Sequence, residues 1–79
     1  MNPDLLMPLE FLRPGDRAEV ADVSGEPGWV GRLAELGLRV GGRLEVLRGG
    51  SPCLVRLGES RLSLRGEQAM QILVRLLTH

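Results

Sequence analysis

The sequence contains no lysine and no tyrosine, and its 79 residues include one cysteine, one histidine and two aromatic residues. The single cysteine, Cys53, excludes a disulfide within the chain and is typical of a protein in a reducing compartment. His79 is the single histidine, so the chain cannot form a cluster of histidine ligands for a transition metal. It also has no other histidine that could act as a general base beside a nucleophile. We therefore expect no enzyme, and we assign no catalytic, cofactor-binding or metal-binding residue.

An excess of charge of one sign is also missing, and so is a long hydrophobic run. Ten arginines balance ten acidic residues, and the two signs interleave along the chain. A nucleic-acid-binding domain concentrates positive charge on one face and stacks bases on aromatic side chains, so we expect no nucleic-acid partner. No stretch approaches the roughly 20 apolar residues that span a bilayer. The first twelve residues lack a basic leader, so we expect neither a signal peptide nor membrane insertion.

The remaining pattern is that of one small globular domain in which 43% of the residues are hydrophobic. Alternation of apolar and polar residues predicts five short strands, and apolar residues at helical spacing predict one short helix between the first two strands. The strands are expected at residues 17–23, 43–48, 53–57, 61–65 and 72–76, the helix at 29–36, and one helical turn at 66–70. This order favours a mostly β, small SH3-like barrel, while a small α+β sandwich with an open sheet fits the same strands.

The predicted helix has an apolar face and a clear end. Trp29, Leu33 and Leu36 recur at helical spacing and are expected to face the core. Gly37 is placed to adopt the left-handed conformation that ends many helices, and Leu38 is then placed to fold back onto the apolar side. A helix of about eight residues is marginal by itself, so we expect packing against the sheet to stabilise it.

Two further glycines, Gly15 and Gly41, are expected to form the turns that lead into the first and second strands. They occupy equivalent positions in an internal similarity, because residues 12–20 and 38–46 agree at six of nine positions. No third copy follows, which excludes a solenoid and indicates that the same type of turn occurs twice.

Candidate functional side chains are few. Cys53 begins an apolar alternation, so we expect a buried small hydrophobic side chain rather than a reactive thiolate. His79 is expected to be solvated. The exposed side of the helix and the corner after it combine charged and apolar residues, which is typical of protein-docking surfaces. The residues expected there are Arg32, Glu35, Leu38 and Arg39.

Several segments together carry a recognisable pattern. They are Arg-Leu-Ala-Glu-Leu-Gly-Leu at residues 32–38, Leu-Glu-Val-Leu at 44–47, Leu-Ser-Leu-Arg at 62–65 and Leu-Glu-Phe-Leu-Arg-Pro-Gly-Asp at 9–16. With Gly41 and residues 69–74, they closely resemble the FeoA family of ferrous iron transport accessory proteins. The resemblance extends from about Leu9 to Arg75.

The resemblance implies an SH3-like barrel over residues 9–77, preceded by a flexible N-terminal segment at residues 1–8. It implies a cytoplasmic protein without catalysis that binds a FeoB-type membrane protein, which carries a GTPase domain and transports ferrous iron. Such a partner would recruit the chain to the inner face of the membrane. The resemblance also implies an association with transition-metal binding, but no ligand set carries over residue by residue.

Two other classes of protein are compatible with parts of the sequence. A KOW-type RNA-binding barrel is suggested by the Pro-Gly-Asp turn at residues 14–16, but that module would continue from Gly31 into a strand, where this sequence predicts a helix. SH3-like domains also occur at the ends of metal-dependent transcriptional repressors. A DNA-reading helix-turn-helix and a set of histidine ligands are missing from this sequence.

Overall fold

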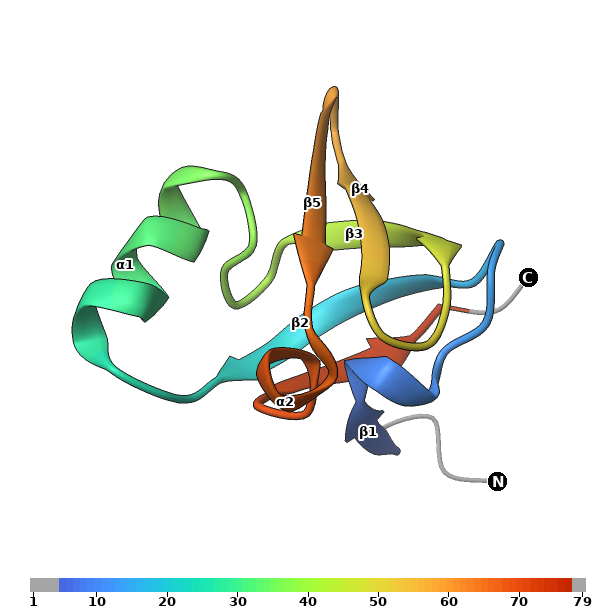
Figure 1. The fold of residues 1–79 in the computed structure, drawn as a ribbon, viewed down its shortest axis with the longest axis horizontal. Helices are drawn as coiled ribbons and strands as arrows, with labels where there is room; N and C mark the ends of the chain where they lie inside the picture. Colours follow the sequence, from blue (N-terminus) through green and yellow to red (C-terminus); the bar gives the residue numbers. More distant parts are fainter. Residues whose placement is uncertain (1–4, 78–79) are drawn as a thin grey trace.

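The structure is a computed structural model that describes residues 5–77. Within these residues the chain forms one antiparallel sheet of six strands and three short helical segments (Figure 1). In chain order the elements are β1 (Leu6–Pro8), the 3-10 helix η1 (Leu9–Phe11), β2 (Arg17–Val23), α1 (Pro27–Glu35), β3 (Arg43–Arg48), β4 (Cys53–Leu57), β5 (Ser60–Leu64), α2 (Gly66–Ala69) and β6 (Ile72–Leu76).

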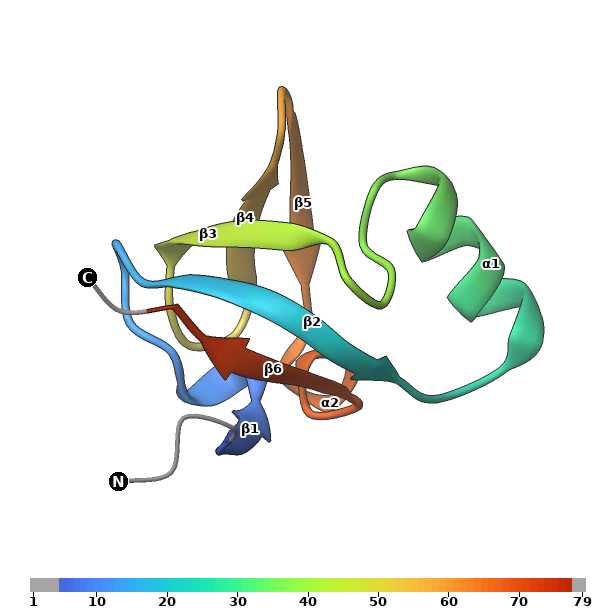
Figure 2. The ribbon, with the colours of Figure 1, turned by 180° about the vertical axis from the view of Figure 1, so that it is seen from behind.

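The strands follow the order β1-β6-β2-β3-β4-β5 across the sheet. The hairpin of β4 and β5 crosses β2, β3 and β6 at a steep angle, so the sheet wraps around one core (Figures 1 and 2). η1 and α2 lie at one open end, and α1 stands to one side of the sheet. The fold is mostly β and SH3-like, as the sequence predicts.

The sheet has one strand more than the five predicted. β1 pairs with β6 through Leu6 opposite Arg75 and Pro8 opposite Leu73. Three residues are too few to produce a recognisable alternation, and this strand forms because β6 offers a free edge. β1 lies within the segment 1–8 that was expected to be flexible, so part of that segment belongs to the sheet. Residues 1–4 and the predicted solvated residue His79 lie outside the described residues.

The other predicted elements agree with the structure to within one or two residues. The main difference is α1, which begins two residues earlier than predicted. Pro27 occupies the start of the helix, where its missing N–H is not needed and its fixed φ suits the first turn. The helix ends at Glu35, so Leu36 is the residue that caps it.

The core is made almost entirely of aliphatic side chains, and no polar or charged residue is buried within the described chain. The strands contribute alternate residues, and η1, α1 and α2 each contribute one. The buried residues are Leu9, Leu12, Ala18, Val20, Leu33, Leu38, Leu44, Val46, Cys53, Val55, Leu57, Leu64, Ala69, Ile72 and Val74.

The internal similarity has a direct structural counterpart. Gly15 donates a hydrogen bond from its N–H to the carbonyl of Val46 (2.7 Å), and Gly41 donates the equivalent bond to the carbonyl of Val20 (2.8 Å). Both glycines have positive φ, 94° and 89°. The turn before β2 is therefore hydrogen-bonded to β3, and the turn before β3 is hydrogen-bonded to β2. This reciprocal pattern relates β2 and β3 by a local pseudo-twofold axis.

Candidate protein-binding surface

The corner that follows α1 has a well-defined backbone. We use the term α1 corner for residues 32–40. Gly37 has a φ of 103°, its N–H donates to the carbonyl of Ala34 (3.0 Å), and the N–H of Leu38 donates to the carbonyl of Leu33 (2.9 Å). This pair of bonds is a Schellman motif, which satisfies carbonyl groups at the end of the helix and fixes the direction of the exit.

The Schellman motif decides which leucines face the core. Leu33 and Leu38 are fully buried, and the N–H of Leu38 donates to the carbonyl of Leu33 in the capping bond that spans more residues. The prediction that Leu38 contributes to a docking surface is therefore wrong, because its side chain has no exposed area. The fold-back position predicted for the same residue agrees with the structure.

Leu38, and not Leu36, occupies the core position at the end of α1. The sequence predicts Leu36 in the core, but its side chain is 43% exposed. The helical spacing ends at Glu35, and the chain reverses at Gly37, so the inward position after Leu33 is taken by Leu38. The Leu-Gly-Leu order at the helix end was the signal that could have shown this, since a Schellman motif pairs the helix with the residue after the glycine.

Three of the four predicted docking residues are exposed, namely Arg32, Glu35 and Arg39. Within the described chain, none of the three forms an ion pair. Leu36 lies among them, and Val40, at 65% exposed, follows directly. The α1 corner thus presents two apolar side chains between three free charges, a combination typical of the centre and rim of a protein interface.

The described residues do not fit a metal centre. Within residues 5–77, no three side chains of histidine, cysteine, aspartate or glutamate come together as ligands would. The Cys53 side chain is buried in the core. Burial, together with the negative charge of Glu10, raises the pKa of its thiol above the ordinary value of 9.0. A neutral, enclosed thiol is neither a good nucleophile nor a ready metal ligand.

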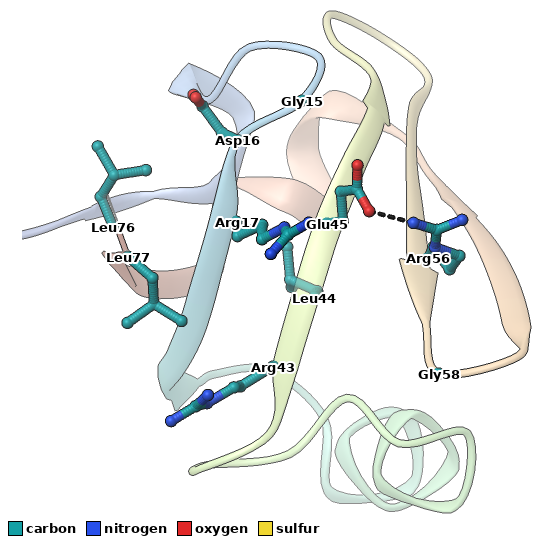
Figure 3. Close-up of a pocket in the computed structure, with 10 residues that line it drawn as sticks. All are labelled: Gly15, Asp16, Arg17, Arg43, Leu44, Glu45, Arg56, Gly58, Leu76 and Leu77. Atoms are coloured by element: carbon teal, nitrogen blue, oxygen red, sulfur yellow. Dashed lines mark hydrogen bonds and ion pairs between the residues drawn. The ribbon is translucent and has the colours of Figure 1, made fainter. Parts of the chain in front are cut away.

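The surface formed by residues 5–77 includes two open hollows. The larger, about 890 Å³, lies over β2, β3, β4 and the end of β6 (Figure 3). Its charged lining residues are three arginines, Asp16 and Glu45, and Leu76 and Leu77 lie at one end. The smaller, about 420 Å³, lies between α1 and α2 beside Trp29 and is lined by Glu26 and Glu67.

No helix in the described part of the chain has the length and hydrophobicity needed to cross a bilayer.

Comparison with known proteins agrees with the sequence resemblance. A search of curated protein sequences finds no match. Among solved structures, the FeoA protein from Chlorobium tepidum is 41% identical, with a TM-score of 0.85, over 91% of this chain and 71% of that one. FeoA from Stenotrophomonas maltophilia, solved with zinc, is 31% identical, with a TM-score of 0.73, over 86% of this chain and 88% of that one.

A manganese-dependent transcriptional repressor has the same fold over part of its length. It is 25% identical with a TM-score of 0.82, and the match covers 98% of this chain but 45% of the repressor. The FeoA domain model matches residues 7–76, nearly the whole of the described chain. The chain therefore belongs to the FeoA domain family.

Proposed function

We propose that this chain is a cytoplasmic accessory protein of ferrous iron uptake that acts by binding a FeoB-type membrane transporter and performs no reaction itself. Membership of the FeoA family supports this function. So does a solved structure described as an iron uptake regulatory protein, which is 27% identical over 92% of this chain. Ferrous iron in this proposal is the cargo of the partner and not a cofactor of this chain.

The observation that carries the proposal is the α1 corner. Leu36 and Val40 are exposed on a corner whose direction is set by the Schellman motif, so their positions are determined before any partner arrives. Binding to such a surface costs little conformational entropy, and the free charges of Arg32, Glu35 and Arg39 surround the apolar centre.

The proposal is tested by measuring binding of the purified chain to the cytosolic portion of the FeoB-type transporter from the same cell, with and without guanine nucleotide. We expect Val40→Asp to weaken binding by about tenfold or more, because it places a charge at the apolar centre. Phe11→Asp is the matched control, since Phe11 is 64% exposed on η1, away from the α1 corner.

The control should bind within about twofold of the wild type. Absence of binding by the folded wild-type chain would contradict the proposed function. Binding that Phe11→Asp weakens and Val40→Asp leaves unchanged would contradict the α1 corner as its site.

Two other functions receive less support from the fold. In place of the strand that a KOW-type module needs after Gly31, the chain continues α1 to Glu35. The repressor relative is more than twice as long as the region matched. Steeply salt-dependent binding of the purified chain to RNA would favour the KOW alternative.

A further inference from the structure

Charged residues on the outer side of the sheet lie in two rows. Antiparallel pairing places Glu19 between Arg75 on β6 and Arg43 on β3. The second row lies two residues further along β3, where Glu45 lies between Arg17 on β2 and Arg56 on β4. Arg61 on β5 is paired with Arg56 and continues this row. These seven side chains alternate with buried residues of the same strands, so they share the outer face. We call it the arginine face.

The pattern follows from the pseudo-twofold relation of β2 and β3. Each strand carries the triplet Arg-x-Glu, at residues 17–19 and 43–45. Because the strands are antiparallel, each arginine lies opposite the glutamate of the other triplet. The Cβ atoms of residues paired in this way are about 5 Å apart. The neighbouring strands β4, β5 and β6 then add one arginine each.

Among these seven side chains, positive charge exceeds negative charge by three, although the whole chain is neutral. Glu45 pairs with Arg56, and Glu19 lies 3.8 Å from Arg75, measured from Oε1 to Nη1. Within the described residues, no carboxylate pairs with the other three arginines, Arg17, Arg43 and Arg61. Three guanidinium groups are thus free to bind anionic groups from outside.

Four of the seven residues also line the larger hollow. Figure 3 shows Arg17, Glu45 and Arg56 following one another across β2, β3 and β4, with Arg43 further along β3. Leu76 and Leu77 lie at the opposite end from Arg56, and the Leu77 N–H donates to the Arg17 carbonyl (2.8 Å). The hollow therefore combines cationic groups with an apolar rim.

We propose that the arginine face binds an acidic polypeptide segment, whose carboxylates contact Arg17, Arg43 and Arg61 and whose apolar side chain contacts Leu77. Guanidinium groups form paired hydrogen bonds with carboxylates, which gives geometric specificity as well as charge attraction. An extended segment places alternate side chains on one side, at a spacing similar to that of the rows.

A polypeptide fits this face better than a nucleic acid or a membrane surface does. A continuous row of phosphates would meet Glu19 and Glu45 as well as the arginines, and like charges repel. A peptide can place a neutral residue opposite each glutamate. Neither of the chain's two aromatic residues, Phe11 and Trp29, is on this face, so bases have no stacking partner there. A flat lipid surface cannot enter a hollow.

The test uses fluorescence anisotropy with the full chain and a short labelled peptide in which glutamates alternate with serines around a central leucine. We expect binding that weakens as salt is raised, and none by the same peptide with glutamine in place of glutamate. Arg17→Gln/Arg43→Gln should weaken binding by about tenfold. Both residues are exposed, so the variant should melt at the temperature of the wild type.

The matched control is Arg13→Gln/Arg65→Gln, which removes the same charge from exposed positions that belong to no strand and do not line the hollow. It should change affinity by less than about twofold. Equal loss in both variants would overturn the proposal, as would the absence of peptide binding at low salt. Tighter binding to a single-stranded RNA or to anionic vesicles than to the peptide, lost in Arg17→Gln/Arg43→Gln, would overturn it in favour of that partner.

The inference does not depend on the identity of the transporter. If the peptide binds and the transporter does not, the proposed function fails and the arginine face stands. If the transporter binds through Val40 and the peptide does not bind, the arginine face fails and the proposed function stands.

Discussion

Gly37 shows how one residue positions the α1 corner. Its φ of 103° is one that side-chain-bearing residues rarely adopt, while a Cβ built there would lie 3.6 Å from that of Leu57, an ordinary contact. Gly37→Ala should therefore destabilise the protein by about 1–2 kcal/mol through backbone strain alone.

Gly31→Ala is the matched change within the same region. Gly31 lies inside α1, and a Cβ there would meet no atom within 4 Å. The substitution should stabilise the protein by about 0.5–1 kcal/mol, because alanine loses less backbone entropy in a helix than glycine does. Chemical denaturation of both variants checks the opposite signs, and a loss of stability in both would contradict this account of Gly37.

Cys53 should make stability depend on alkaline pH. Its folded pKa is raised, mainly by burial, above the ordinary value of 9.0. The stabilising contribution is then complete below the unfolded pKa and is lost as pH rises toward the folded one, because only the unfolded thiol ionises. In urea unfolding between about pH 7 and about pH 10, the wild type should lose stability above pH 9, and Cys53→Ala should show a flatter profile at lower overall stability. Parallel profiles would contradict the prediction.

At the scale of elements, α1 depends on a single anchor. Leu33 is the one fully buried residue of the helix, and a nine-residue helix is marginal without packing. Leu33→Ala should lower the free energy of unfolding by about 2–5 kcal/mol. Leu36→Ala, the same change at an exposed position, should alter it by less than about 0.5 kcal/mol. Similar losses from both substitutions would mean that Leu36 packs inward after all.

The strands were predicted well because their alternation is local. For β2, β3, β4 and β6 the predicted and observed limits agree, and the glycines before β2 and β3 have the positive φ that their turns need. The first strand, β1, was missed because it has three residues and depends on the edge of β6, which is more than 60 residues away in the sequence. Leu36 was misplaced because helical periodicity cannot by itself show where the helix ends.

At the scale of the whole molecule, the acidic side chains and Cys53 are too dispersed or too enclosed to hold a transition metal within the described residues. We expect calorimetric titration with zinc, or with ferrous iron under anaerobic conditions, to show no stoichiometric submicromolar binding by one chain. A one-to-one site of that affinity would contradict the prediction. Measuring the oligomeric state alongside the titration separates a site within one chain from one shared between copies.

The two surfaces differ in how far the sequence could reveal them. The α1 corner is one continuous segment, so three of its charged residues were identified from helical spacing and its glycine. The arginine face was not identified, because its arginines lie between residues 17 and 75 and interleave with acidic residues along the chain. Interleaving in the sequence suggested an even charge distribution. Strand pairing instead collects five arginines and two glutamates on one side.

By itself, the sequence determined the strands, the helix, the glycine turns and the family, since alternation, helical spacing and short motifs involve residues that are neighbours along the chain. Only the tertiary structure decided that β1 joins the sheet and that the arginines share a face. Each of these depends on contacts or pairings whose geometry no local pattern encodes, because burial and cross-strand register are set when distant segments pack together.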